Sequence, residues 1–224
     1  MTRKATKKGQ YPKSPFDHYV EEQWVTIQLI AMELEAGCQL WRRGTIWDPA
    51  CGFGNVLKAF GHLNGASVHA TDIQFRGFAA KGLFYELDFV GNLDFVRSAA
   101  PKGRYNIVSN SPYSYKKGIL EAFIRRAMEL DADKVAFLMP VARQAGENRQ
   151  PLFDEFPPAR IYILSERPSM PPGAEIEALG DKAYKRGKID FMWVVWDRRN
   201  PTPVGETRWR TIPVRDKAAK AVAK

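Results

Sequence analysis

Short apolar runs alternate with longer amphipathic segments along the chain, which predicts alternating strands and helices. The apolar runs have strand length and end at polar or turn-forming residues. Apolar positions recur at helical spacing over residues 17–36 and 119–130, and a further helix is expected to begin at Val56. This order predicts an α/β fold with a seven-stranded, mostly parallel sheet and helices on both faces. The expected strands cover residues 45–47, 67–70, 83–87, 105–109, 134–139, 160–164 and 190–196.

Residues that are candidates for ligand binding or catalysis follow four of these strands directly. They occupy positions 48–54, 72, 88 and 110–113. In open α/β sheets, ligands bind in the crevice beyond the carboxyl ends of the strands. The sequence therefore predicts one ligand site, built from these four strand ends.

The overall composition suits one domain with its own core. The chain has 224 residues, of which 45% are hydrophobic, and we expect a single domain over residues 15–200. Two cysteines provide no disulfide framework, which favours a reducing cytoplasm. The longest apolar run, 135–142, contains a proline and is too short to span a bilayer, and no apolar segment follows the basic N-terminus as in a secretory signal.

The net charge of +9 is concentrated at the two ends of the chain. Residues 1–14, an expected flexible arm, contain five Lys or Arg and no acid. The expected tail, 201–224, ends in a segment with four Lys or Arg and one acid, and the remaining chain is nearly neutral. Basic arms on a near-neutral body suit a polyanionic partner such as nucleic acid, although a solvated tail that aids solubility has the same composition.

The Gly-x-Gly turn after the first strand is a candidate ligand loop. Gly52 and Gly54 carry no Cβ atoms, so a ligand can approach the backbone closely. Many structural turns contain glycines too, and the turn alone leaves both interpretations open. Leu57 stands where a dinucleotide fingerprint has its third glycine, which disfavours a nicotinamide or flavin cofactor.

Acids at the next two strand ends are candidate contacts to an adenosine-containing cofactor. Asp72 follows Gly54 by 18 residues and is placed to accept hydrogen bonds from ribose hydroxyls, or to cap a helix. Asp88 is placed to accept from an adenine amino group, with Phe89 beside the ring.

The run Asp48-Pro49-Ala50-Cys51-Gly52-Phe53-Gly54 resembles the DPACGxG motif of the amino-methyltransferases of DNA. The resemblance implies a Rossmann-like fold that binds S-adenosylmethionine, with the 48–54 loop around its methionine and ribose parts. It also implies ribose and adenine contacts by Asp72-Ile73 and Asp88-Phe89. The segment from Phe16 to Trp24 is similar in position to the family's N-terminal motif, but it matches that motif poorly in letters.

The run Asn110-Ser111-Pro112-Tyr113 resembles the (D/N/S)PPY catalytic motif of the same family, with Ser111 in place of the first proline. In this role, the Asn110 oxygen and a backbone carbonyl accept the N–H groups of an exocyclic base amine. Tyr113 provides a flat face for the base. Ser111 keeps the main-chain carbonyl but removes the restraint that proline places on φ, so an active and an inactive site both stay open.

A basic loop before the last expected strand is the candidate substrate contact. Its cations surround an aromatic residue, as suits a phosphate contact beside a stacked base, although a solvated charged loop has the same pattern. The region also resembles small phage and prophage adenine methyltransferases. No metal site is expected, because His18, His62 and His69 share no ligand spacing. The candidate substrate residues are Lys182, Tyr184, Lys185, Arg186 and Lys188.

These features together favour methylation of the N6 amine of adenine in DNA with S-adenosylmethionine as cofactor. Cytosine N4 in DNA, adenine in RNA and a glutamine amide in protein remain alternatives, because the same motif serves all of them. A catalytically inactive S-adenosylmethionine-binding or DNA-binding module is a further alternative, raised by Ser111. The expected partner is DNA, with RNA as the alternative and no membrane.

Overall fold

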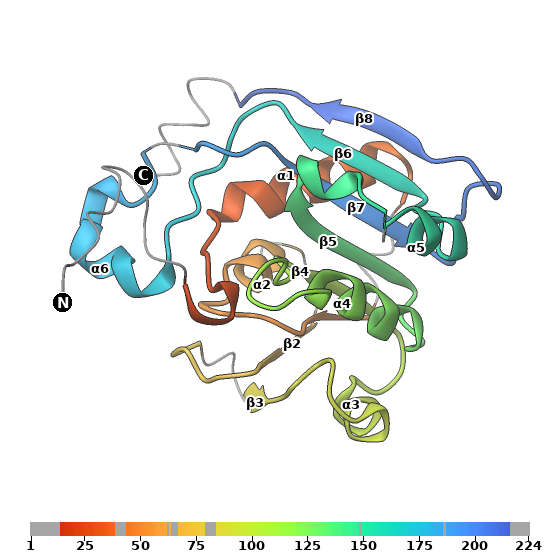
Figure 1. Cartoon of the computed structure of the whole chain (residues 1–224), viewed down its shortest axis with the longest axis horizontal. Coiled ribbons are helices and arrows are strands. Elements are labelled where there is room, and N and C mark those ends of the chain that lie inside the picture. Colours follow the sequence, from red (N-terminus) through yellow and green to blue (C-terminus); the bar gives the residue numbers. More distant parts are fainter. Residues whose placement is uncertain are drawn as a thin grey trace.

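A computed structural model describes residues 14–38, 44–61, 63, 67–78, 84–147, 149–185 and 187–215. These residues form one eight-stranded sheet in the order β3-β2-β1-β4-β5-β7-β6-β8, which runs from bottom to top in Figure 1. The strands are β1 Thr45–Asp48, β2 Ser67–Asp72, β3 Phe84–Glu86, β4 Tyr105–Ser109, β5 Lys134–Pro140, β6 Arg160–Leu164, β7 Phe191–Asp197 and β8 Arg208–Ile212. The α-helices are α1 Gln23–Glu35, α2 Asn55–Phe60, α3 Leu93–Ala99, α4 Ile119–Met128, α5 Gln150–Glu155 and α6 Ile176–Leu179, with 3₁₀ turns at Pro15–Asp17, Val141–Gln144, Gly173–Glu175 and Gly180–Lys182.

The sheet is mostly parallel, as the sequence predicts. The five strands from β3 to β5 run parallel, whereas β7 pairs antiparallel with both β5 and β6. The predicted count of seven strands is wrong by one, because β8 pairs in parallel with β6. This strand lies in the segment 201–224 that was predicted to be a basic tail, and four of its five residues are exposed.

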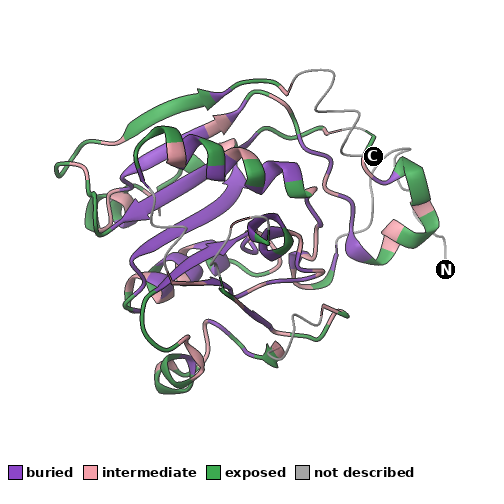
Figure 2. Cartoon of the chain, turned by 180° about the vertical axis from the view of Figure 1, so that it is seen from behind, coloured by how far each residue is buried: buried purple, intermediate pink, exposed green. Residues whose placement is uncertain are grey.

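Helices cover both faces of the sheet, and each face has its own apolar core. α1 and α2 pack on one face, and α3, α4 and α5 pack on the other. Successive strand residues serve the two cores in turn, so Ile46 belongs to the first and Trp47 to the second. The central strands β4, β5 and β7 are accordingly buried along their whole length, whereas β8 is mostly exposed (Figure 2). No helix in the described part of the chain has the length and apolar character needed to cross a bilayer.

The N-terminal boundary of the first helix differs from the prediction. The sequence predicts a helix over 17–36, but α1 begins at Gln23. The preceding residues form a 3₁₀ turn and an extended segment, and Tyr19 makes an isolated β-bridge with Pro172. Phe16 and Asp17 both have φ of 53°, in the left-handed region that L-residues rarely adopt. Tertiary contacts therefore override helical spacing over this segment, called here the N-terminal strap (residues 14–22).

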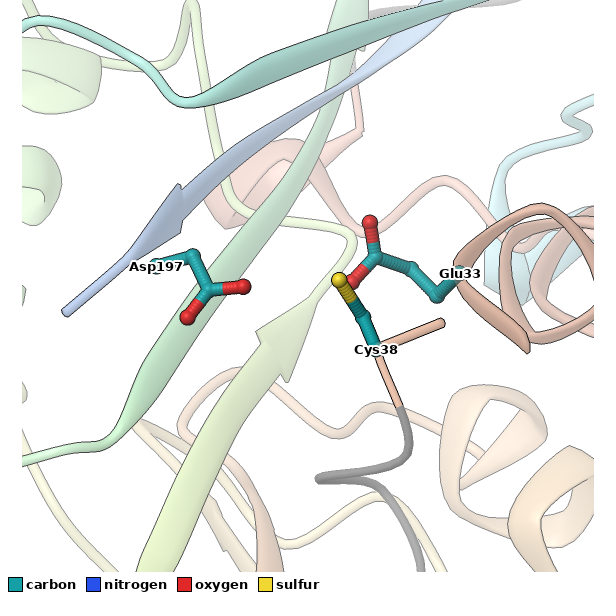
Figure 3. Close-up of side chains that lie close together, drawn as sticks. All are labelled: Glu33, Cys38 and Asp197. Atoms are coloured by element: carbon teal, nitrogen blue, oxygen red, sulfur yellow. The ribbon is translucent and has the colours of Figure 1, made fainter. Parts of the chain in front are cut away.

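A buried ionic network joins α1 to three strands at the end of the sheet opposite the predicted ligand site. Glu33 accepts hydrogen bonds from Arg160 at 2.6 Å and from Tyr162 at 2.8 Å. Lys134 forms ion pairs with Glu33 and, at 3.6 Å, with Asp197. Two acids thus balance Lys134 and Arg160, the latter also bound to Asp197. The Cys38 sulfur points toward the Glu33 carboxylate (Figure 3), but both carboxylates are already neutralised by cations, so the group serves as an internal salt-bridge network.

Candidate active site

The carboxyl ends of β1, β2 and β4, the residues after β3 and the N-terminal strap line one cavity. Its empty space, including the open mouth, measures ≈ 660 Å³. Gly54, Ser111 and Tyr113 are described but are not among the residues that line it. The sequence-predicted residues that do line it are Asp48, Pro49, Ala50, Cys51, Gly52, Asp72, Ile73, Asp88, Phe89, Asn110 and Pro112.

Asp48 connects the ends of neighbouring strands at the floor of this cavity. Its Oδ1 accepts hydrogen bonds from the Ser109 hydroxyl at 2.6 Å and from the Ala50 N–H at 3.1 Å. Burial raises the pKa of the Asp48 carboxyl well above its usual value, and the nearby Glu21 and Asp72 raise it further. Asp48 therefore fixes the loop after β1 against the last residue of β4.

The two predicted adenosine contacts lie side by side at the ends of β2 and β3. Asp72 accepts hydrogen bonds from the Gly52 N–H at 2.9 Å and from the Gln74 N–H at 3.1 Å. Arg76, which the sequence analysis missed, pairs with Asp72 at 3.5 Å and also lines the cavity. Asp88 is exposed, and the adjacent Phe89 is buried. An acceptor beside an apolar aromatic wall is the arrangement that an adenine ring requires.

The glycine loop takes its sharp turn as predicted, but the space left by its missing Cβ atoms is filled by protein. Gly52 and Gly54 have φ of 50° and 75°. A Cβ on Gly54 would lie 2.3 Å from the Phe78 ring, and one on Gly52 would lie 3.1 Å from the His18 imidazole. Gly54 does not line the cavity, and its missing Cβ makes room for the Phe78 ring. Gly52 lines the cavity, with the His18 imidazole on the side where a Cβ would stand.

Asn110 is held in one orientation at the end of β4. Its Nδ2 donates to the Tyr19 carbonyl at 2.9 Å and to Glu21 Oε2 at 2.7 Å. Its Oδ1 has no hydrogen-bond partner among the described residues. Glu21 is only 5% exposed, and burial raises the pKa of its carboxyl. The sequence analysis did not select Glu21, since only tertiary structure brings it to Asn110.

The remaining motif residues have distinct surroundings. Ser111 is buried, and its hydroxyl has no hydrogen-bond partner among the described residues. The guanidinium of Arg143 lies 5.9 Å from the centroid of the Tyr113 ring, and Phe191 packs on the ring edge. Tyr113 is thus sandwiched beside the cavity instead of lining it.

His18 is the central residue of the N-terminal strap. It packs edge-on against Phe53 at 4.9 Å, and a Cβ on Gly173 would lie only 2.0 Å from its ring. Burial, and then the nearby Arg76, lowers the pKa of His18 to about 4. The imidazole is therefore neutral near pH 7, and its Nε2 is buried with no hydrogen-bond partner in the described chain.

Solved structures with the same fold were found by comparison, whereas no protein-family model and no curated protein matches the chain. The methyltransferase subunit of a type I restriction-modification system from Streptococcus thermophilus aligns with TM-score 0.53 and 12% identity, over 81% of this chain and 45% of that one. A candidate RNA methyltransferase from Pyrococcus horikoshii aligns with TM-score 0.52 and 13% identity, over 77% and 82%. A candidate hemolysin from Lactococcus lactis aligns with TM-score 0.52 and 13% identity, over 84% and 93%.

This chain has the Rossmann-like methyltransferase fold. Its β7 is the antiparallel strand of that fold, inserted between β5 and β6. The cavity of this methyltransferase fold is acidic although the chain carries a net charge of +9. One guanidinium, Arg76, and the neutral His18 accompany the carboxyl groups. A cavity of this kind favours a cationic small molecule. The carboxyl groups belong to Asp17, Glu21, Asp48, Asp72 and Asp88.

The predicted substrate loop lies outside the cavity of the methyltransferase fold, and Arg186 lies outside the described residues. Lys182, Lys185 and Lys188 are exposed. Tyr184 is half-buried, and its pKa is raised to about 12 by burial and then by Glu21 and Glu22. The loop therefore approaches the strap beside the cavity, and its three described lysines are exposed.

Proposed function

We propose that this protein transfers a methyl group from S-adenosylmethionine to an exocyclic amino group of a nucleic-acid base, with N6 of adenine in DNA as the first candidate. The observation that carries the proposal is the placement of Asn110. Its amide nitrogen is held by two acceptors, while the residue lines the same cavity as the loop after β1. A polar amine acceptor and a cofactor loop thus share one cavity.

The cavity residues fit S-adenosylmethionine. Asp72 suits the ribose hydroxyls, and Asp88 with Phe89 suits the adenine. The 48–52 loop and the neutral His18 lie where the methionine part would bind, and the acidic lining suits a sulfonium and an ammonium group. The cofactor supplies a methyl group that is already activated on a sulfonium.

The residues of this chain would promote the reaction by orienting the substrate amine toward the methyl group. An exocyclic amine is a poor nucleophile because its lone pair is delocalised into the ring. The Asn110 oxygen and one backbone carbonyl of the motif can each accept one N–H, which turns the lone pair out of the ring plane as the transition state requires. The methylated nitrogen then loses one proton to solvent, so no strong base is required.

Three observations favour a nucleic acid as the methyl acceptor. The described residues next to the two basic ends contact the strap and α1: Ser14 donates to the His18 carbonyl at 3.0 Å, and Arg215 lies 3.9 Å from the centroid of the Trp24 ring. The lysines of the 180–188 loop are exposed near the same strap. The similar structures include a restriction-modification methyltransferase subunit and a candidate RNA methyltransferase.

The test is transfer of tritium from methyl-labelled cofactor to unmethylated DNA, RNA and protein, each supplied separately. We expect label in DNA, recovered as N6-methyladenine after digestion. Asn110→Ala should abolish transfer while cofactor affinity, measured by calorimetry, changes by at most about threefold. If only RNA or only protein became labelled, that molecule and not DNA would be the substrate. Cofactor binding without transfer to any pool would indicate a non-catalytic binding protein.

The role of the N-terminal arm is tested separately through salt. Each phosphate contact made by Lys or Arg steepens the dependence of binding on salt concentration. Removal of residues 1–13, which carry five cations, should therefore flatten the plot of log affinity for DNA against log salt. An unchanged slope would show that this arm makes no phosphate contacts.

A further inference from the structure

We propose that Glu21 is a positioning residue that fixes the side-chain amide of Asn110, so that its oxygen and not its NH₂ group meets the substrate amine. The inference rests on the proposed function. The two ends of an asparagine amide are nearly equal in size, so only hydrogen-bonding neighbours decide which end points into a cavity. If the NH₂ group faced the amine, two donors would oppose each other.

The neighbours of Asn110 allow one orientation only. The Tyr19 carbonyl at 2.9 Å and Glu21 Oε2 at 2.7 Å are both acceptors, so Nδ2 must face them. The Tyr19 carbonyl can only accept, and Glu21 Oε2 also accepts from Nδ2. A flipped amide would place its oxygen against two acceptors. Glu21 thus makes the wrong orientation costly.

Glu21 is itself held in place. Its side chain is 5% exposed, and its main-chain carbonyl accepts a hydrogen bond from Asn55 Nδ2 at 2.7 Å. Asn55 is the first residue of α2, directly after the glycine loop. The contact therefore ties the orientation of Asn110 to the cofactor loop. This restraint has particular value here, since Ser111 lacks the rigidity of the proline in the motif that it resembles.

The decisive experiment exchanges donor and acceptor between the two residues. Asn110→Asp alone would oppose two carboxylates, and kcat should fall at least about tenfold because the pair cannot both stay ionised at this distance. Adding Glu21→Gln restores a donor–acceptor pair in the reverse sense and should recover part of that loss, because the Tyr19 carbonyl still faces a carboxylate oxygen. Glu21→Ala alone should lower kcat about tenfold, and the rise in KM for the cofactor that follows from removing one cavity carboxyl should be smaller than this fall. Glu22→Gln, at the neighbouring glutamate, is the matched control for the Glu21→Gln change.

A second measurement does not depend on turnover. The side-chain NH₂ signals of Asn110, assigned by their loss in Asn110→Ala, should exchange with solvent faster in Glu21→Ala than in Glu22→Ala. Faster exchange in Glu21→Ala would support the positioning role. If the wild-type protein at the same time transferred no methyl group, the proposed function would be refuted. An unchanged exchange rate, or no recovery when Glu21→Gln is added to Asn110→Asp, would overturn the positioning role even if the enzyme methylates DNA.

Discussion

The carboxylate of Asp17 accepts a hydrogen bond of 3.0 Å from the backbone N–H of Tyr113, 96 residues further along the chain. The same carboxylate accepts from the backbone of Ser114 and, at 2.7 Å, of Tyr115. Asp17 of the strap thereby holds the end of the 110–113 motif and the residues that follow it. Glu21 of the same strap holds Asn110, the first residue of the motif. The left-handed φ of Asp17 is a local strain that these charged hydrogen bonds offset.

Asp17→Ala should lower both stability and transfer. Three backbone N–H groups would lose their shared acceptor, and we expect the free energy of unfolding to fall by about 2–3 kcal/mol. Loss of loop order should lower kcat by about tenfold or more. Urea unfolding and methyl-transfer kinetics measure the two effects, and Asp17→Asn should be intermediate because one acceptor oxygen remains. Unchanged kinetics in a folded Asp17→Ala protein would show that the strap does not order the motif.

Asp72→Ala should weaken cofactor binding by a larger factor than it lowers kcat. The variant removes the predicted ribose acceptor and also frees the Gly52 N–H that Asp72 holds. We expect S-adenosylmethionine to bind roughly 10- to 100-fold more weakly by calorimetry, which corresponds to about 1.4–2.8 kcal/mol. Asp94→Ala, at an exposed acid of α3, is the control and should bind normally. If Asp72→Ala bound S-adenosylmethionine with normal affinity, Asp72 would not be a ribose contact.

His18 should make stability fall as the pH falls from about 6.5 to 4. The folded state depresses the pKa of this histidine from its ordinary value of 6.5 to about 4, so between these values the unfolded chain binds a proton that the folded chain does not. Unfolding is then favoured by acid. His18→Gln removes this linkage, and the stability of the wild type relative to the variant should decline over that range in denaturant titrations. A constant difference across it would contradict the neutral, buried assignment of His18.

Glu33→Gln should strongly destabilise the fold. It would leave Lys134 and Arg160 short of a compensating charge in the interior, and breaking a buried ion pair on one side costs about 3–5 kcal/mol. Glu35→Gln is a matched control two residues along α1, because Glu35 pairs with Arg210 at the exposed surface and should contribute at most about 1 kcal/mol. Chemical denaturation measures both. If Glu33→Gln and Glu35→Gln lowered the free energy of unfolding equally, Glu33 would not be needed to balance the charges of Lys134 and Arg160.

The sequence determined the order and type of most elements. Strands such as Tyr105–Ser109 and Arg160–Leu164 have the predicted bounds, because strands buried on both faces appear in a sequence as short, mostly apolar runs. The acids at strand ends were also visible, since the α/β architecture itself directs the residues that follow β1, β2, β3 and β4 to one edge of the sheet.

Only the tertiary structure decided what surrounds those residues. β8 escaped prediction because four of its five residues are exposed, and pairing along an edge leaves no apolar pattern. The strap escaped because its conformation comes from hydrogen bonds to residues about 90 or more positions away, such as Glu21 to Asn110. The glycine loop was found correctly, but its packing against Phe78 and His18 depends on side chains from other segments. Local pattern encodes burial, whereas the partner of a polar side chain is set by the folding of distant segments onto the same site.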